Sequence, residues 1–226
     1  AAAAGSTLGW LEGFGVRFDF LPSYLLTQST TRIAPIGGGL ALVEALAEQA
    51  EAKGADFHYQ TTAQRLIQDE SGAVVGLVAT GERNRVRRFT AKAIVLACGG
   101  FQGNAEMQAH YLGPQARYIR PVARGGYYNK GEGIRMALAI NAAPAGEYSD
   151  FHAEPVDPRS GRHEPIVLVF PYGILVNRAG ERFVDEASGL VDAIYEEVTR
   201  RINSQPGGIA YVILDGKIDD VSGWQR

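Results

Sequence analysis

The apolar segment Ala93–Cys98 is the feature that most constrains the fold of this chain. A continuous apolar run of this length, without alternation, is typical of a strand that is buried on both faces. The run stops at Gly99-Gly100. Glycine at the end of a buried strand lets the backbone approach a ligand closely. We therefore expect a core strand that ends at the rim of a binding groove.

Glycine is unusually frequent, with 28 residues in the chain. Three clusters lie beside predicted strand or helix ends, at Gly37–Gly39, Gly99-Gly100 and Gly131/Gly133. Backbone N–H groups at a helix start favour anions such as a pyrophosphate, so these clusters fit the rim of a nucleotide site. Turn and capping glycines would give the same pattern. Neither G-x-G-x-x-G nor G-x-x-x-x-G-K-[ST] occurs in the sequence.

Composition excludes several classes of protein. The net charge is −3 and no block of basic residues is present, which argues against a surface for nucleic acid or an anionic membrane. No apolar run approaches the roughly 18–20 residues of a membrane span. The single cysteine rules out an internal disulfide and a Cys-rich metal cage, and the dispersed histidines do not specify a metal site. These features fit a cytoplasmic protein.

Periodicity predicts a mixed chain of the α/β or α+β class, with a β-meander in its first half. The sequence predicts several helices. One follows Gly37–Gly39 and ends at Gly54, one starts at Asn104, and one spans Gly133–Ala142. A further helix carries on one face Val191, Ile194, Tyr195, Val198 and Ile202. Strands are expected at Phe57–Tyr59, Ala63–Gln68, Val74–Ala79, Val86–Phe89, Gly173–Arg178, Arg182–Val184 and Ala210–Leu214. Gly5–Pro35 shows no clear period. A change of character near Tyr148 predicts two domains, 1–147 and 148–226.

Five segments occur in an order that resembles one flavoprotein family. They read PIGGGLALVEALAEQAEAKGADFHYQTTAQRLIQDESGAVVGLVA, AIVLACGGFQGN, NKGEGIRMALAINAAPAG, DFHAEP and FPYGILVNRAGERFVDE. This order is similar to that of the FAD-dependent fumarate reductase/succinate dehydrogenase flavoproteins, and its closest likeness is to the tricarballylate dehydrogenase-like members. By this resemblance the chain is an internal piece. Residues 1–147 would be the central part of an FAD-binding domain without its N-terminal Rossmann βαβ unit, and 148–226 would be part of an α+β capping domain.

The resemblance also implies which residues face FAD. Cys98, Gly99 and Gly100 fall where the family has A-T-G-G beside the cofactor, with Cys98 in place of threonine. The backbone around Ala63 would line the adenine. Glu132 stands where the family's G-D-G places an aspartate near the flavin.

His152 falls at the family's H-P-T element, whose histidine binds a substrate carboxylate. An imidazole with an unperturbed pKa of about 6.5 suits this task, because a neighbouring anion favours its cationic form. The alternative is a loop histidine that is hydrogen-bonded to backbone. Leu190 stands where fumarate-reducing members have a proton-donating arginine, so ordinary fumarate reduction is disfavoured. Another FAD-dependent oxidation, or an acid supplied from elsewhere, fits better. Arg182 and Glu186 are interpreted as a structural pair, and the alternative is a contact with the substrate.

The leading hypothesis is a fragment of an FAD-dependent oxidoreductase that acts on a small carboxylate-bearing molecule. The intact enzyme would transfer a hydride between a substrate carbon and flavin N5. The isolated fragment is expected to hold no FAD and to be inactive. The alternative is a non-catalytic binding or interaction module on the same scaffold. The residues do not specify the electron acceptor, the attachment of the flavin or the oligomeric state.

Overall fold

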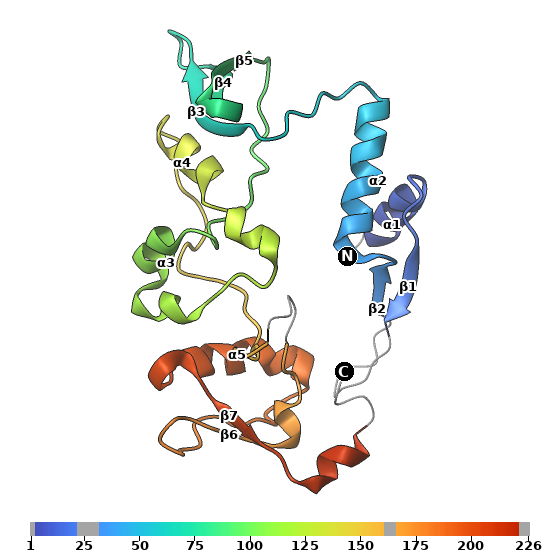
Figure 1. Cartoon of the computed structure of the whole chain (residues 1–226), viewed down its shortest axis with the longest axis vertical. Helices are drawn as coiled ribbons and strands as arrows, with labels where there is room; N and C mark the ends of the chain where they lie inside the picture. Colours follow the sequence, from blue (N-terminus) through green and yellow to red (C-terminus); the bar gives the residue numbers. More distant parts are fainter. Residues whose placement is uncertain (1–2, 22–31, 161–165, 222–226) are drawn as a thin grey trace. The chain divides into compact units, whose positions relative to one another are not determined.

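The computed structural model describes residues 3–21, 32–160 and 166–221, and the chain divides into two compact units, Ala1–Tyr59 and Gln60–Arg226. Short helices and small antiparallel sheets alternate along the chain (Figure 1). The expected mixed α+β class is therefore confirmed. The expected domain boundary near Tyr148 stays a prediction.

The first unit contains the helices α1 (Ala4–Glu12) and α2 (Gly38–Ala52) and the antiparallel strands β1 (Phe18–Leu21) and β2 (Arg32–Pro35). The expectation that Gly5–Pro35 forms no regular element is wrong for α1, β1 and β2. These elements escape a search for periodicity because both strands are very short and α1 buries no residue. The part of the start at 22–31 lies outside the described residues.

Helix α2 confirms the prediction that followed from Gly37–Gly39. Gly37 precedes the helix with a φ of 88°, and Gly54 follows it with a φ of 86°. Only glycine adopts such angles without steric strain, which explains why the helix starts and stops there. The expected strand at Phe57–Tyr59 is wrong, because these residues are irregular.

The second unit opens with the predicted meander. Strands β3 (Thr62–Gln68), β4 (Val74–Thr80) and β5 (Val86–Thr90) pair antiparallel in that order, with a short 3₁₀ turn, η1 (Glu82–Asn84), before β5. The Asp69 carboxylate accepts backbone N–H bonds from Ser71 and Ala73 and so fixes the turn between β3 and β4. Leu66, Val78 and Ala79 are buried in this sheet.

The segment Ala93–Cys98 is not a strand, which corrects the first prediction made from the sequence. It is extended without a ladder, and 88% of Val95 and 40% of Leu96 are exposed. A buried strand needs neighbouring strands on both sides to bind its backbone. Among the described residues no strand pairs with this segment. Within the part of the chain that the structure describes, this apolar segment therefore has no partner strand.

Four short helical elements follow this segment: α3 (Ala105–Leu112), η2 (Pro114–Tyr118), η3 (Arg124–Tyr128) and α4 (Glu132–Leu138). The helix predicted from Asn104 is confirmed by α3, and Asn104 caps it by accepting hydrogen bonds from the N–H groups of Glu106 and Met107. Helix α4 confirms the helix expected from Gly133. It ends earlier than expected, since Asn141 turns the chain with a φ of 67°.

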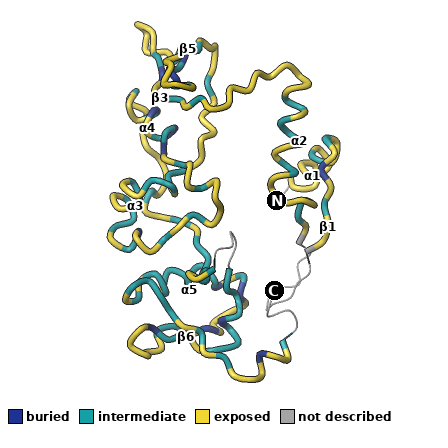
Figure 2. The backbone as a smooth tube through the Cα atoms, viewed as in Figure 1, coloured by how far each residue is buried: buried dark blue, intermediate teal, exposed yellow. Residues whose placement is uncertain are grey.

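The last part of the chain holds η4 (Phe170–Tyr172), β6 (Ile174–Val176), α5 (Val191–Asn203), η5 (Pro206–Gly208), β7 (Tyr211–Ile213) and η6 (Gly216–Asp220). Strand β6 pairs with β7, whereas Arg182 makes only one isolated bridge with Val176, so the expected strand Arg182–Val184 is wrong. Phe170, Leu175, Val191 and Val198 are the largest fully buried side chains among the described residues. This core anchors α5 through its predicted apolar face. Most of the backbone is exposed or intermediate, with short buried stretches, for example near β6 (Figure 2).

Every helix in the described residues is too short or too polar to span a lipid bilayer.

Candidate functional site

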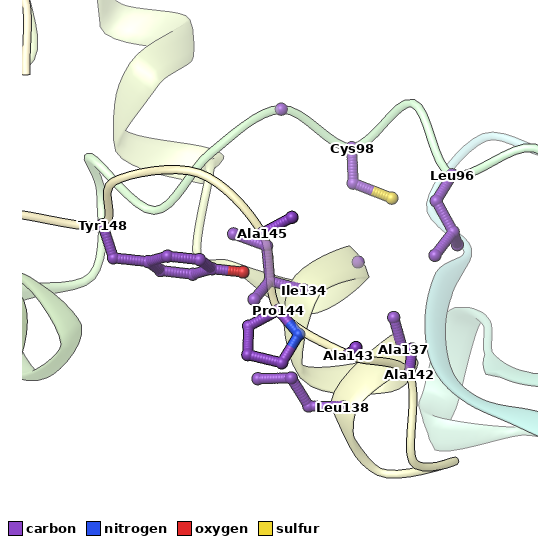
Figure 3. Close-up of a pocket in the computed structure, with 12 residues that line it drawn as sticks. Leu96, Cys98, Ile134, Ala137, Leu138, Ala142, Ala143, Pro144, Ala145 and Tyr148 are labelled. Atoms are coloured by element: carbon purple, nitrogen blue, oxygen red, sulfur yellow. The ribbon is translucent and has the colours of Figure 1, made fainter. Parts of the chain in front are cut away.

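A shallow depression of about 240 Å³ lies between the segment that ends in Gly99 and helix α4 (Figure 3). Its walls are mostly small or apolar. They are formed by Leu96, Cys98, Gly99, Gly133, Ile134, Ala137, Leu138, Ala142, Ala143, Pro144, Ala145 and Tyr148. The small side chains leave backbone accessible on both sides, so the depression suits a flat, apolar part of a ligand.

Glycines stand where this segment closely approaches α4 and Asn129. A Cβ on Gly133 would lie 3.3 Å from both Cβ and Sγ of Cys98. A Cβ on Gly99, whose φ is 71°, would lie 3.1 Å from the side-chain amide nitrogen of Asn129. The two chain segments therefore approach each other more closely than larger residues allow.

Hydrogen bonds hold the loop after Gly99 against the start of α4. The N–H of Gly131 donates to the carbonyl of Gly100 at 3.2 Å, and the N–H of Gly103 donates to the carbonyl of Asn129 at 2.9 Å. The Asn104 side chain donates to the carbonyl of Lys130 at 2.8 Å. These contacts fix one wall of the depression relative to the other.

The structure brings together some of the predicted cofactor residues. Cys98 and Gly99 line the depression, and Gly100 and Glu132 adjoin it in sequence. The Glu132 carboxylate accepts a hydrogen bond from the N–H of Lys130 at 3.0 Å. Ala63 is not among the lining residues and pairs with Ala79 in the meander. Contacts of all five residues with FAD stay predictions.

His152 is not among the residues that line the depression. Its Nδ1 lies 3.3 Å from Glu196 Oε2, and its Nε2 lies 2.9 Å from the Tyr195 hydroxyl. Both ring nitrogens thus contact side chains of α5. The alternative interpretation expected a hydrogen bond to backbone, and neither of these contacts is of that kind. The sequence missed Tyr195 and Glu196 as partners because they lie more than forty residues away along the chain, separated by 43 and 44 positions.

Arg200 ties the same part of α5 to the segment that carries His152. Its Nη2 donates to Glu196 Oε1 at 2.9 Å, to Asp150 Oδ1 at 2.5 Å and to the carbonyl of Phe151. The hydrogen bond from Arg200 is the main cause that holds the pKa of Glu196 below its ordinary value, and the contact with His152 acts in the same direction. The Glu196 carboxylate is therefore an anion at neutral pH.

Arg182 and Glu186 confirm the predicted structural pair. Glu186 is only 2% exposed, and its carboxylate accepts bonds from Arg182 Nη2 and from the N–H of Leu175, each at 2.6 Å. Burial disfavours its charged form, but these hydrogen bonds outweigh burial and lower the pKa of Glu186. The pair fixes the loop after β6 against that strand.

Within the described residues, no group of histidine, cysteine, aspartate and glutamate side chains could hold a metal ion.

The sequence matches the family model described as "FAD binding domain" over residues 2–221. The chain therefore belongs to this family of FAD-binding flavoproteins. It is 27% identical to a probable fumarate reductase of Shewanella frigidimarina, over 92% of this chain and 35% of that protein. It is 28% identical to a vinyl phenol reductase of Lactiplantibacillus plantarum, over 80% of this chain and 38% of that protein.

The fold shows the same relationship. The open conformation of a flavocytochrome c3 fumarate reductase superposes with a TM-score of 0.73 and 25% identity, over 97% of this chain and 38% of that one. The chain thus spans little more than a third of the length of these relatives. The recognised flavoprotein family and its FAD cofactor are confirmed, whereas the likeness to tricarballylate dehydrogenase-like members stays a prediction.

Proposed function

We propose that this chain is an internal piece of an FAD-dependent oxidoreductase that transfers a hydride between flavin N5 and a carbon of a small carboxylate-bearing substrate. One observation supports it most strongly. A depression with glycine and alanine walls lies beside Cys98-Gly99, in a chain that matches the FAD-binding family along nearly its whole length.

The residues present fit a flavin nucleotide. Cys98, Gly99 and Gly100 offer backbone without bulky side chains, and the walls from α4 are small and apolar. In the intact protein Cys98, Gly99, Gly100, Glu132 and the backbone at Ala63 would hold FAD. When bound, FAD would supply the hydride chemistry. The chain's own residues would position the cofactor, and the part after Tyr148 would cover the site and exclude water.

A carboxylate substrate is supported by His152 and by the relatives. His152 contacts the Tyr195 hydroxyl, and Arg200 binds the carbonyl and the ring of the neighbouring Phe151, so a hydroxyl and a cationic group lie at the segment that carries His152. Several relatives are fumarate reductases by name. Leu190 precedes α5, and its side chain is neither an acid nor a base. Fumarate-reducing members have a proton-donating arginine at this position, so here the proton that accompanies the hydride must come from another residue.

The test uses the full-length protein that contains this chain, with its flavin reduced anaerobically by dithionite. Fumarate, aconitate and 4-vinylphenol are mixed with it separately, and reoxidation of the flavin is followed by absorption. The oxidised protein is mixed with tricarballylate in parallel. We expect reaction with at least one of the carboxylic acids and none with the uncharged 4-vinylphenol. Reaction with 4-vinylphenol alone would contradict the carboxylate assignment.

A second candidate is a non-catalytic binding module on the same scaffold, which the apolar Leu190 favours. A full-length protein that is purified without flavin absorption would support this candidate.

A further inference from the structure

Exposed arginines gather on the three-stranded sheet β3–β4–β5 (Figure 1). We call them the basic patch, which consists of Arg65 on β3, Arg83 in the turn η1, Arg85 directly after it, and Arg87 and Arg88 on β5. Glu82 is the only acidic residue between positions 81 and 90. In the described part of the chain, no arginine of the patch forms an ion pair. The patch therefore presents positive charge that no carboxylate there neutralises.

The register of the sheet joins arginines that are distant in the sequence. Arg65 of β3 and Arg88 of β5 both pair with Val78 of β4. Residues that stand directly opposite each other in antiparallel strands lie on the same face. Because neighbouring strands are about 4.8 Å apart, the two arginines flank Val78 on one face at a spacing of about 10 Å. In the sequence the arginines alternate with neutral residues, whereas the fold collects them on one small sheet.

The turn before β5 keeps an arginine at a backbone position that favours glycine. Arg83 has a φ of 54° and Asn84 a φ of 57°, and the N–H of Arg85 donates to the carbonyl of Glu82 at 3.2 Å. Tight turns with two left-handed residues usually contain glycine, because a side chain is strained there. Such strain is concentrated at functional sites. Arg83 thus points to a role for its charge outside the fold itself.

Two further features of β5 suit contact with a protein. The Arg87 guanidinium lies 4.9 Å from the centre of the Phe89 ring, so it is already ordered and loses less freedom when it binds. Val86, between Arg85 and Arg87, is 71% exposed. Arginines around an exposed apolar side chain are typical of protein–protein interfaces.

We propose that the basic patch is a docking surface for a separate protein that presents a cluster of aspartate or glutamate carboxylates. Guanidinium groups bind carboxylates through paired, charge-assisted hydrogen bonds. The whole chain has a net charge of −3, so an extended polyanion such as DNA or an anionic bilayer also meets negative surface. A compact carboxylate cluster stays within a Debye length of the patch, about 10 Å at 0.1 M salt. This docking surface does not depend on the proposed oxidoreductase activity.

The test measures how a fluorescein-labelled decaglutamate peptide binds the full-length protein that contains this chain, by fluorescence anisotropy at low salt. The triple variant Arg83→Ser/Arg85→Ser/Arg88→Ser should weaken binding by about tenfold, as expected for the loss of three exposed ion pairs. The difference from the wild type should shrink at high salt, because salt screens exposed charges.

The matched control is Lys53→Ser/Arg124→Ser/Lys217→Ser. It removes the same charge from three exposed positions outside the patch, so it should bind the peptide like the wild type. Equal weakening by both triple variants would show that only net charge matters and would overturn the proposal. Wild-type affinity in the arginine variant, or no binding of the peptide by the wild type at low salt, would overturn it as well.

Arg83→Gly separates binding from folding. Glycine relieves the left-handed backbone at this position, so the melting temperature should rise, whereas the affinity for the peptide should fall by about threefold. A variant that gains stability and keeps the wild-type affinity would contradict the role of Arg83. Single-stranded DNA and vesicles of phosphatidylserine and phosphatidylcholine are tested in parallel. Tighter, arginine-dependent binding of either one than of the peptide would overturn the assignment to an acidic protein.

Discussion

Glu186 is a single buried residue that links β6 to the loop after it in the second unit. Its side chain is 3% exposed, yet it is charged. Arg182 forms an ion pair with the carboxylate, and the N–H of Leu175 donates a hydrogen bond to it. A buried carboxylate that loses its partner keeps the cost of desolvation without the compensating bond.

Arg182→Ala in the full-length protein should therefore lower the free energy of unfolding, because the buried carboxylate of Glu186 loses its charged partner. Arg201→Ala is a matched control, because Arg201 and Glu197 form an exposed pair with the same spacing. It should cost less than about 0.5 kcal/mol. Denaturant unfolding measures both, and equal losses would contradict the role of Glu186.

The pKa of Glu186 also predicts a pH dependence. Its folded value lies below the ordinary 4.5, so its contribution to stability is present above pH 4.5 and is lost as the pH falls through the folded value. Glu186→Gln should reduce the loss of thermal stability between neutral pH and pH of about 3, because glutamine does not titrate. Melting curves at several pH values test this, and an unchanged acid limb in the variant would contradict it.

At the scale of elements, local signals determine where the chain turns. Asn104 caps α3 and also binds the carbonyl of Lys130, so one side chain serves two segments. Asn104→Ala should cost about 1 kcal/mol and increase hydrogen exchange of the N–H groups of Glu106 and Met107. Asn104→Asp, which keeps the cap but cannot donate to Lys130, should protect these amides better than alanine. Equal exchange in the wild type and Asn104→Ala would contradict the cap.

Elements with a local signal could be predicted from the sequence, and elements that depend on distant partners could not. The meander follows from alternating residues and turn residues, and α5 follows from an apolar face that is indeed buried. Ala93–Cys98 has the composition of a core strand, but a strand forms only when others pair with it. Composition alone also could not reveal that β6 forms its ladder with β7, while Arg182 makes only an isolated bridge with Val176.

At the scale of the whole molecule, the candidate site was only partly predictable. Gly99, which follows the apolar run, lines the depression, while its contact with FAD stays a prediction. The partners of His152 could not be identified, since Tyr195 and Glu196 reach it only after the chain has folded. The large apolar side chains that stay exposed include Leu40, Val43 and Val95. Apolar surface of this kind is typical of interaction sites.

We therefore expect the isolated 226-residue chain to bind FAD weakly or not at all, whereas the full-length protein binds it. Equilibrium dialysis of both proteins against FAD measures the difference. Tight stoichiometric binding of FAD by the isolated chain would show that the chain needs no further part to form the site.

The FAD content of the purified full-length protein tests the central claim most directly. Cys98→Trp should fill the depression and abolish most of the flavin absorption, while Cys98→Thr should keep it. Ala139→Trp, on the exposed end of α4 outside the lining, should also keep it. This account predicts loss of flavin in Cys98→Trp alone. A Cys98→Trp protein with a full complement of FAD would contradict it.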